Sequence, residues 1–358
     1  MKGLFVLSAA MTTLGFATAA GDITGPGWGG ACTQGPIEAC HKPFTAGTGI
    51  NVIPADTDNP ATPIKAMVGA GNVTVDVAPV DYAGALRLCD KGLLEPIDAA
   101  TLPPAPDGTR AIDDFLPRAV TDCLVSTDVC STVCACDTTR YRGNPPATVA
   151  DFFDLEKFPG KRGIRKGAKG TLEVALLADG VAPADVHALL STPGGLDRAF
   201  ARLDTIKAET LRREAGAQPP QLLVDGEVVM TVAWNGRIFD AAVAEGKPFS
   251  IVRDGQVCEM EGFVIPKGAP NRDAAMEFIR FATGTGPLAH AAEWISYGPP
   301  RKSSAPLVGL YQDGKTEMAP NLPASPGNMT NALASGCGFW VDRDTELNEG
   351  FNAWLAAN

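Results

Sequence analysis

Apolar positions along the chain predict alternating strands and helices. Short apolar runs over 50–54 and 73–77 are typical of strands, and apolar residues recur at helical spacing over 61–69 and 82–94. The second half repeats this alternation, with helices expected over 172–177, 186–190, 196–206, 272–281 and 347–355 and strands over 228–233 and 263–266. Strands that alternate with helices are typical of a parallel sheet covered by helices. We therefore predict an α/β fold.

The N-terminal residues indicate export. Lys2 precedes an apolar stretch over 4–11, and small residues follow up to Ala17-Thr18-Ala19. This pattern is typical of a secretory signal peptide with an A-x-A cleavage site, because the apolar stretch is too short to cross a bilayer. A buried N-terminal helix is the alternative. We predict a signal peptide over 1–19 and a mature protein located in the periplasm.

Composition narrows the possible functions. The 358 residues include 30 Lys+Arg and 41 Asp+Glu, a net charge of −11, which disfavours nucleic-acid binding. Three histidines leave little scope for histidine-based catalysis, and no nucleophile–base motif supports an enzyme. A glycine-punctuated basic run over 161–169 lacks the phosphate-loop spacing, so we predict a solvated surface loop there. We expect no cofactor and no catalytic residue.

Nine cysteines, an odd number, leave at least one thiol unpaired in an oxidising compartment. The densest group is Cys130, Cys134 and Cys136, and a zinc site there would require a fourth ligand. His41, beside Cys40, is the only histidine adjacent to a cysteine. We predict that several of the cysteines are small core residues and that one or two disulfides form among them. We predict no metal site. An exported thiol or metal-binding protein that uses the Cys130 group is the alternative function.

Three ordered sets of motifs resemble a known family. They are Trp28-Gly29-Gly30 with Pro43-Phe44 and Thr48-Gly49-Ile50, then 151–154 and 158–163 leading into 171–180, then 226–230 and 234–237 followed by 263–269. In this order and spacing they resemble the family 1 extracellular solute-binding proteins of ABC importers, in the spermidine/putrescine-type branch. The resemblance covers nearly the whole chain after residue 19.

The resemblance implies a two-lobed α/β periplasmic binding protein fold with a strand hinge and an interlobe cleft. Lobe one would comprise 20–129 and 258–299, and lobe two 130–257 and 300–358. Segments 130–137 and 256–263 are extended and suited to crossing between the lobes. The implied function is non-enzymatic: a monomer captures a small polar solute by hinge closure and delivers it to an inner-membrane ABC permease.

The resemblance also implies a set of ligand-binding residues. Trp28, Tyr82 and Trp234 would form aromatic walls, and Glu173 and Glu261 would pair with ammonium groups. Carboxylates suit buried cations, and aromatic faces suit both cations and methylene groups. Each residue also has a structural alternative: core packing for the aromatic rings, a helix N-terminal charge for Glu173, and a solvated hinge position for Glu261.

Departures from the family pattern leave the ligand open. Cysteines stand where aromatic residues are usual, at 32, 136 and 258, and Arg212-Arg213 stands where Trp-Trp is common. Two arginines near a cleft would repel a polycation. The ligand is therefore either polyamine-like or another amine-bearing compound, and the arginines favour an anionic or zwitterionic one.

Overall fold

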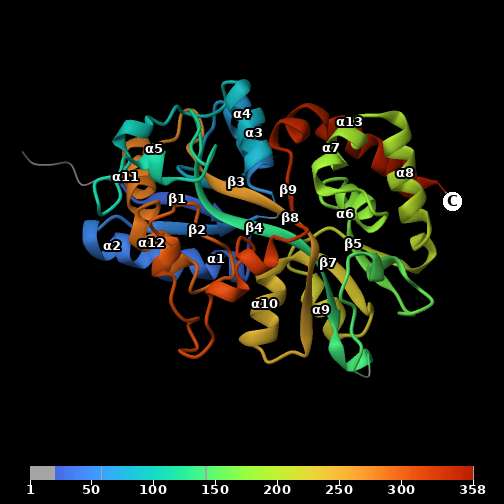
Figure 1. Ribbon diagram of the computed structural model, residues 1–358. Helices are drawn as coiled ribbons and strands as arrows, with labels where there is room; N and C mark the ends of the chain where they lie inside the picture. The colour runs from blue at the N-terminus through green and yellow to red at the C-terminus, as the bar shows by residue number, and fades with distance from the viewer. Residues whose placement is uncertain (1–20, 58, 142, 358) are drawn as a thin grey trace, which may run out of the picture.

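The computed structural model describes residues 21–57, 59–141 and 143–357, and its chain forms two lobes (Figure 1). The signal peptide predicted over 1–19 lies outside the described residues. No helix in the described part of the chain is long and apolar enough to cross a membrane.

Two long antiparallel strands connect the lobes: β4 (Val125–Asp137) and β8 (Phe249–Val264) (Figure 1). Val125 and Phe263 lie in the core of lobe one, whereas Cys134 and Val252 lie in the core of lobe two. The sheet has the order β3-β8-β4-β7-β5-β6, with β9 beside β8. Its other strands are β3 (Ala78–Asp81), β5 (Arg162–Arg165), β6 (Thr210–Arg213), β7 (Met230–Trp234) and β9 (Leu333–Ala334).

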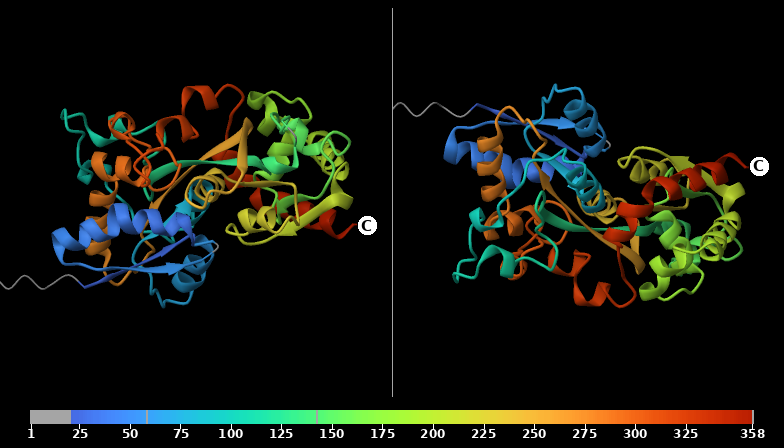
Figure 2. Two further views of the ribbon diagram at one scale, coloured as in Figure 1. Left: turned by 90° about the horizontal axis from the view of Figure 1, so that it is seen from below. Right: turned by 90° about the horizontal axis from the view of Figure 1, so that it is seen from above.

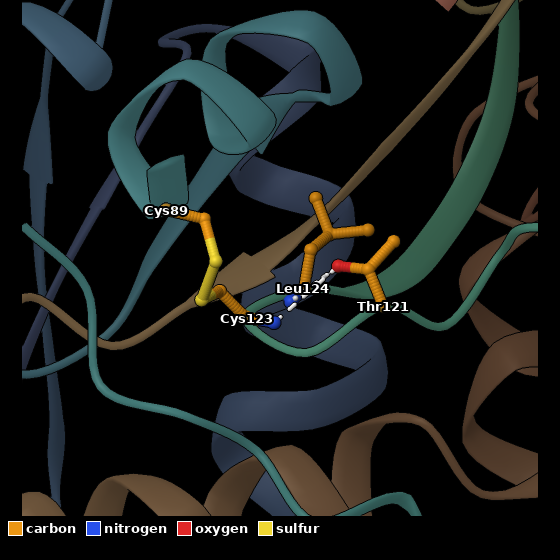
Figure 3. The surroundings of a disulfide bond; sticks show 4 residues. All are labelled: Cys89, Thr121, Cys123 and Leu124. Carbon is orange, nitrogen blue, oxygen red and sulfur yellow. Dashed lines mark hydrogen bonds between the residues drawn. A yellow bond between two sulfur atoms is a disulfide. The ribbon is translucent and has the colours of Figure 1, made fainter. Parts of the chain in front are cut away.

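Lobe one packs helices around a small parallel sheet of β1 (Ile23–Gly27) and β2 (Val52–Asp56). Its helices are α1 (Ala31–Pro36), the π-helical turn η1 (Ile37–His41), α2 (Lys42–Thr48), α3 (Ala61–Gly69), α4 (Tyr82–Asp90), α5 (Ala111–Asp114), α11 (Arg272–Ala282) and α12 (Thr285–Ala291). Phe44 and Phe278 meet edge to face in its core. A disulfide joins Cys89 at the end of α4 to Cys123 just before β4, and so ties two segments of this lobe together (Figure 3).

Lobe two is built around α6 (Thr171–Ala178), whose residues are all buried and, apart from Thr171 and Glu173, apolar. The other helices are α7 (Val186–Leu190), α8 (Pro193–Asp204), α9 (Pro219–Val224), α10 (Asn235–Val243) and the C-terminal α13 (Cys337–Ala356). Short 3-10 turns complete both lobes: η2 (Ala99–Thr101), η3 (Thr138–Arg140), η4 (Ala150–Phe153), η5 (Pro183–Asp185), η6 (Lys207–Glu209), η7 (Ala305–Leu307), η8 (Ala319–Asn321) and η9 (Pro326–Asn328). The C-terminal helix α13 runs close to α4 near the junction of the lobes (Figure 2). There, Arg87 of α4 donates to the Trp340 carbonyl of α13 at 2.9 Å.

The predicted α/β class is confirmed, and the sheet is mixed: β5 pairs in parallel with β6 and β7, but other pairs are antiparallel. Pairs β3–β8, β4–β8 and β4–β7 are antiparallel because the two long strands cross the molecule in opposite directions. The expected helix over 61–69 coincides with α3. The expected strand over 73–77 is wrong; this segment forms no strand, and β3 begins directly after it.

The predicted crossing segments, 130–137 and 256–263, lie within β4 and β8. The remaining lobe boundaries stay proposals, and one contact bears on the boundary at 299. Arg301 is buried in a salt bridge with Asp114 of lobe one at 3.1 Å. We therefore propose that the last crossing into lobe two comes after Ser304, whose hydroxyl donates to the Thr285 carbonyl of lobe one at 2.8 Å.

Candidate ligand-binding cleft

A cleft lies between the lobes where the strands cross. It contains about 1090 Å³ of space, counting the solvent at its mouth, and a neighbouring recess contains about 330 Å³. Trp28, Asp81, Trp234 and Glu259 line both spaces. The two spaces therefore share one set of walls, and those walls combine aromatic rings with ionisable groups.

Two indoles from opposite lobes meet in this cleft. The ring centroids of Trp28 and Trp234 are 5.6 Å apart in an edge-to-face arrangement. Trp28 follows β1 and precedes two glycines with positive φ, Gly29 and Gly30, a conformation that glycine adopts at little cost. Arg237 of α10 holds this turn by donating to the carbonyl oxygens of Trp28 at 2.8 Å and Gly29 at 3.0 Å. The sequence-predicted Trp28 and Trp234 are thus brought together.

Four carboxyl groups form what we call the acidic row: Asp81, Glu261, Asp128 and Glu259. Asp81 of β3 and Asp128 of β4 are both register partners of Glu261 on the intervening β8. Glu259 lies two residues before Glu261 and therefore on the same face of the strand. Like charges directly opposite each other destabilise a sheet, so this arrangement calls for cations or protons.

Glu261 and Asp128 form the part of the row where protons are held. Burial, together with the negative charge of Asp128, raises the pKa of Glu261 well above its usual range. Burial raises the pKa of Asp128 to about 7, and Glu259 adds to the rise. Thr127 donates to one oxygen of Asp128 at 3.0 Å, but the other, Oδ1, is buried with no hydrogen-bond partner among the described residues. An incoming ammonium group would supply the missing donor.

Lys169 balances the other part of the row. It lies in the loop between β5 and α6 of lobe two, and its Nζ is 2.9 Å from Asp81 Oδ2 and in contact with Glu259. Burial acts to raise the pKa of Asp81, but the charge and hydrogen bond of Lys169, together with the Arg87 charge and the Gly84 N–H, hold that pKa below the usual value. Burial likewise acts to lower the pKa of Lys169, but the two carboxylates raise it above the ordinary value.

Guanidinium groups gather on the lobe-two side. Arg165 and Arg213 are register partners at the carboxyl ends of the parallel strands β5 and β6, and both line the cleft. The Arg165 guanidinium lies 5.0 Å from the centre of the Trp234 ring. Burial and the charges of Arg165 and Arg237 lower the pKa of Arg213 to about 9. Ligands of α/β proteins commonly bind outside the carboxyl ends of strands, and this cationic edge suits a carboxylate.

Arg212 and Arg213, predicted together near the cleft, are separated by strand alternation. Arg213 lines the cleft and donates to the Val232 carbonyl at 2.8 Å. Arg212 does not line the cleft, because neighbouring residues of β6 face opposite sides. One of the two arginines therefore has the placement that the sequence suggested.

The surroundings of Glu173 and Tyr82 favour structural roles for these two residues over contact with a ligand. Both oxygens of Glu173 are occupied: one accepts from the Gly170 N–H at 2.7 Å, and the other contacts Trp340 Nε1 at 2.8 Å and His187 Nε2 at 2.7 Å. Tyr82 begins α4, is 4% exposed, and packs in an apolar cluster rather than on the cleft walls. Their ligand roles stay predictions, and we infer that Glu173 positions α6 by capping it.

Sequence reasoning missed Asp81, Asp128, Glu259, Lys169 and Arg165. Glu259 could have been found, because it alternates with Glu261 in a segment already expected to be extended. The solvated loop that the sequence predicts over 161–169 is wrong for Lys169, because its side chain is 24% exposed and reaches the opposite lobe. Asp81 and Asp128 depend on strand register, which local patterns do not specify.

The alternative based on the Cys130 group is not supported by the structure. Cys130 packs against Ile295 and Tyr297, whereas Cys134 and Cys136 lie in the core of lobe two. Burial raises the pKa of both Cys134 and Cys136 to about 12, which makes them unreactive thiols. Within the described ranges, no group of three or more His, Cys, Asp or Glu residues is placed to hold a metal ion.

Comparisons with known proteins agree with the fold. The profile of the bacterial extracellular solute-binding protein family matches residues 39–324. The gamma-aminobutyric acid-binding protein of Pseudomonas aeruginosa is 43% identical over 329 residues, covering 92% of this chain and 89% of the relative. The structure of the Atu4243-GABA receptor aligns with a TM-score of 0.78 at 33% identity, over 94% of this chain and 98% of that one.

A polyamine-binding relative matches a shorter region. The spermidine/putrescine-binding periplasmic protein of Salmonella typhimurium is 32% identical over 108 residues, or 27% of this chain and 31% of the relative. The predicted family and two-lobed binding-protein fold are confirmed, and the relatives are binding proteins rather than enzymes. The chain belongs to the bacterial extracellular solute-binding protein family, as a substrate-binding component of an ABC transporter.

Proposed function

We propose that the protein captures a small ω-amino acid, with an ammonium group at one end and a carboxylate at the other, such as 4-aminobutanoate. The observation that carries this proposal is the separation of charge within one cleft. Glu261 lines the recess on one side and has Asp128 as its register partner, and neither has a salt-bridge partner among the described residues; Arg165 and Arg213 line the cleft on the other side. A zwitterion of matching length would satisfy both sides.

The expected ligand contacts are charge-assisted hydrogen bonds and a contact between a cation and an indole face. Each charge-assisted hydrogen bond contributes about 1.5–3 kcal/mol, and a cation over an indole face adds about 0.5–2 kcal/mol. A micromolar dissociation constant corresponds to about −8 kcal/mol, so several of these contacts must form together to offset the cost of immobilising the ligand. The paired indoles of Trp28 and Trp234 would contact the methylene groups between the charged ends.

The relatives support a zwitterion over a polycation. Two relatives that align over more than nine-tenths of this chain are named for gamma-aminobutyric acid, whereas the spermidine/putrescine-binding match spans about a quarter of it. The arginine side of the cleft also opposes a second ammonium group. The polyamine-like ligand expected from the sequence is therefore the weaker candidate.

Transport would couple ligand capture to lobe closure. Lys169–Asp81 and Arg237–Trp28 join the lobes, so a ligand that adds contacts to both sides would stabilise this closed arrangement. We infer from the family that the protein acts in the periplasm and presents the closed form to an inner-membrane ABC permease. Its monomeric state and its signal peptide remain predictions from the sequence.

Titration calorimetry on the purified mature protein tests the proposal. We expect 4-aminobutanoate to bind with micromolar affinity, and butanoate and butylamine, which each lack one charged end, to bind at least about 100-fold more weakly. Equal affinity for 4-aminobutanoate and butylamine would contradict a carboxylate subsite. Equal affinity for 4-aminobutanoate and butanoate would contradict an ammonium subsite.

A further inference from the structure

We propose that Lys169 is a specificity-determining residue: its ammonium group occupies the position that a second ligand ammonium would take, so the cleft accepts monoamines and rejects diamines. This inference rests on the proposed function and concerns the same cleft. It assigns a selective role to a residue that lies outside the aromatic and carboxylate set expected from the sequence.

The geometry of the acidic row provides two separate places for a cation. One is bounded by Asp81 and Glu259, which line the cleft, and the other by Glu261, which lines the adjoining recess and is the register partner of Asp128. A row with four carboxyl groups suits a ligand with two ammonium groups. Lys169 removes one of these places, because its Nζ contacts both Asp81 and Glu259.

Lys169 reaches the acidic row from the opposite lobe, as a ligand ammonium would. It comes from lobe two, whereas Asp81 lies on β3 of lobe one, so its ammonium enters the row across the cleft as a ligand would. Glycines at 167 and 170 flank its loop, and Gly170 has a φ of 80° that a residue with a Cβ rarely adopts. The loop is thus shaped to direct Lys169 inward.

The remaining charges agree with a single ligand ammonium. With Lys169 in place, the Glu261–Asp128 pair is the part of the row without a cation among the described residues. A diamine bound there would bring its second ammonium toward Lys169 or toward Arg165 and Arg213, and like charges in a water-poor site repel. A terminal carboxylate would instead be attracted to the same cations. Lys169 therefore acts by repulsion of the wrong ligand.

The test compares 4-aminobutanoate with 1,4-diaminobutane in Lys169→Met. We expect affinity for 1,4-diaminobutane to rise at least about tenfold and the preference for 4-aminobutanoate to fall by at least the same factor. Lys169→Arg keeps the charge and should keep the wild-type preference. Lys65→Met, on the exposed surface of α3, makes the same charge change away from the cleft and should alter neither affinity.

A second variant guards against misfolding, because Lys169→Met leaves Asp81 and Glu259 without their cation. Lys169→Met combined with Asp81→Asn keeps the local charge balance and leaves Glu259 to receive the second ammonium. It should show the same gain for 1,4-diaminobutane. If both variants melt cooperatively and neither gains affinity, the role of Lys169 is refuted, while wild-type binding of 4-aminobutanoate would still uphold the proposed function. A gain by either variant supports Lys169 even if 4-aminobutanoate binds poorly.

Discussion

The two sides of the cleft carry opposite charge and are built in different ways. The acidic row lies on three adjacent antiparallel strands, so strand register places Asp81, Glu261 and Asp128 side by side. The arginine side lies at the carboxyl ends of parallel strands, where Arg165 and Arg213 project toward the crossing point. The acidic side is partly neutralised by Lys169, whereas no described carboxylate forms a salt bridge with Arg213. One side of the cleft is therefore suited to bind a single cation, and the other to bind an anion.

Substitution of Arg213 should cause the largest loss of ligand affinity. Arg213→Gln removes a buried cation from the anion side, and we expect affinity for 4-aminobutanoate to fall by about 2–4 kcal/mol. Arg212→Gln is the matched control, because the Arg212 side chain does not line the cleft. This substitution should change affinity by less than about 0.5 kcal/mol. Calorimetric titration measures both, and equal losses would place the anion site elsewhere.

Glu261 and Glu173 allow ligand binding to be distinguished from folding. Glu261→Gln should weaken 4-aminobutanoate by about 1.5–3 kcal/mol, because a charge-assisted contact becomes a neutral one. It should leave butanoate, which has no ammonium, nearly unchanged.

Glu173→Gln should act on stability instead. It disturbs the capping of α6 and the contacts with His187 and Trp340, so we expect about 1–3 kcal/mol less unfolding free energy with ligand selectivity unchanged. Thermal melts with and without ligand separate the two glutamates. A change in selectivity with Glu173→Gln would return this residue to the ligand site.

Affinity should depend on pH through the carboxyl pair. An ammonium ligand prefers ionised carboxylates, and the pKa of Asp128 is raised to about 7 and that of Glu261 lies well above its usual range. We expect affinity for 4-aminobutanoate to rise between pH 5 and pH 7, by up to about tenfold per pH unit for each carboxyl that must release its proton when the ligand binds. Asp128→Asn should flatten the profile, and an unchanged slope would exclude the pair.

In the absence of ligand, the same two carboxyl groups should make the folded protein less stable as pH rises, whereas ligand affinity increases. A carboxyl whose folded pKa is raised binds its proton more tightly in the folded state, so its contribution is present at low pH and is lost as pH rises through that pKa. For Asp128 this window runs from its unfolded value near 4 to about 7. The melting temperature of the wild type relative to Asp128→Asn should fall across that window.

The indole contact should give the smallest effect. Trp234→Ala removes a ring that contacts Trp28 and lies beside Arg165, and we expect a loss of about 1 kcal/mol in affinity with the fold retained. Trp234→Phe keeps an aromatic face and should lose less. Unchanged binding by Trp234→Ala would remove this residue from the site.

The sequence predicts the family and the two-lobed class, and through the resemblance it points to Trp28 and Trp234 as cleft residues, because the motifs that carry the resemblance are local features. It does not predict the acidic row, since Asp81 and Asp128 reach Glu261 only through the register of strands distant in sequence. The role of Lys169 was missed for a similar reason: a lysine in a basic glycine-rich loop is usually solvated, and only the opposite lobe gives it partners. Cysteine pairing is also a long-range property, and Cys89–Cys123 could not be chosen from spacing alone.

A crystal structure of the protein with 4-aminobutanoate tests the central claim most directly. The account predicts the ligand ammonium within hydrogen-bonding distance of Glu261, its carboxylate on the side of Arg165 and Arg213, and Lys169 still joined to Asp81 and Glu259. A ligand bound in the reverse orientation, or outside the interlobe cleft, would contradict it.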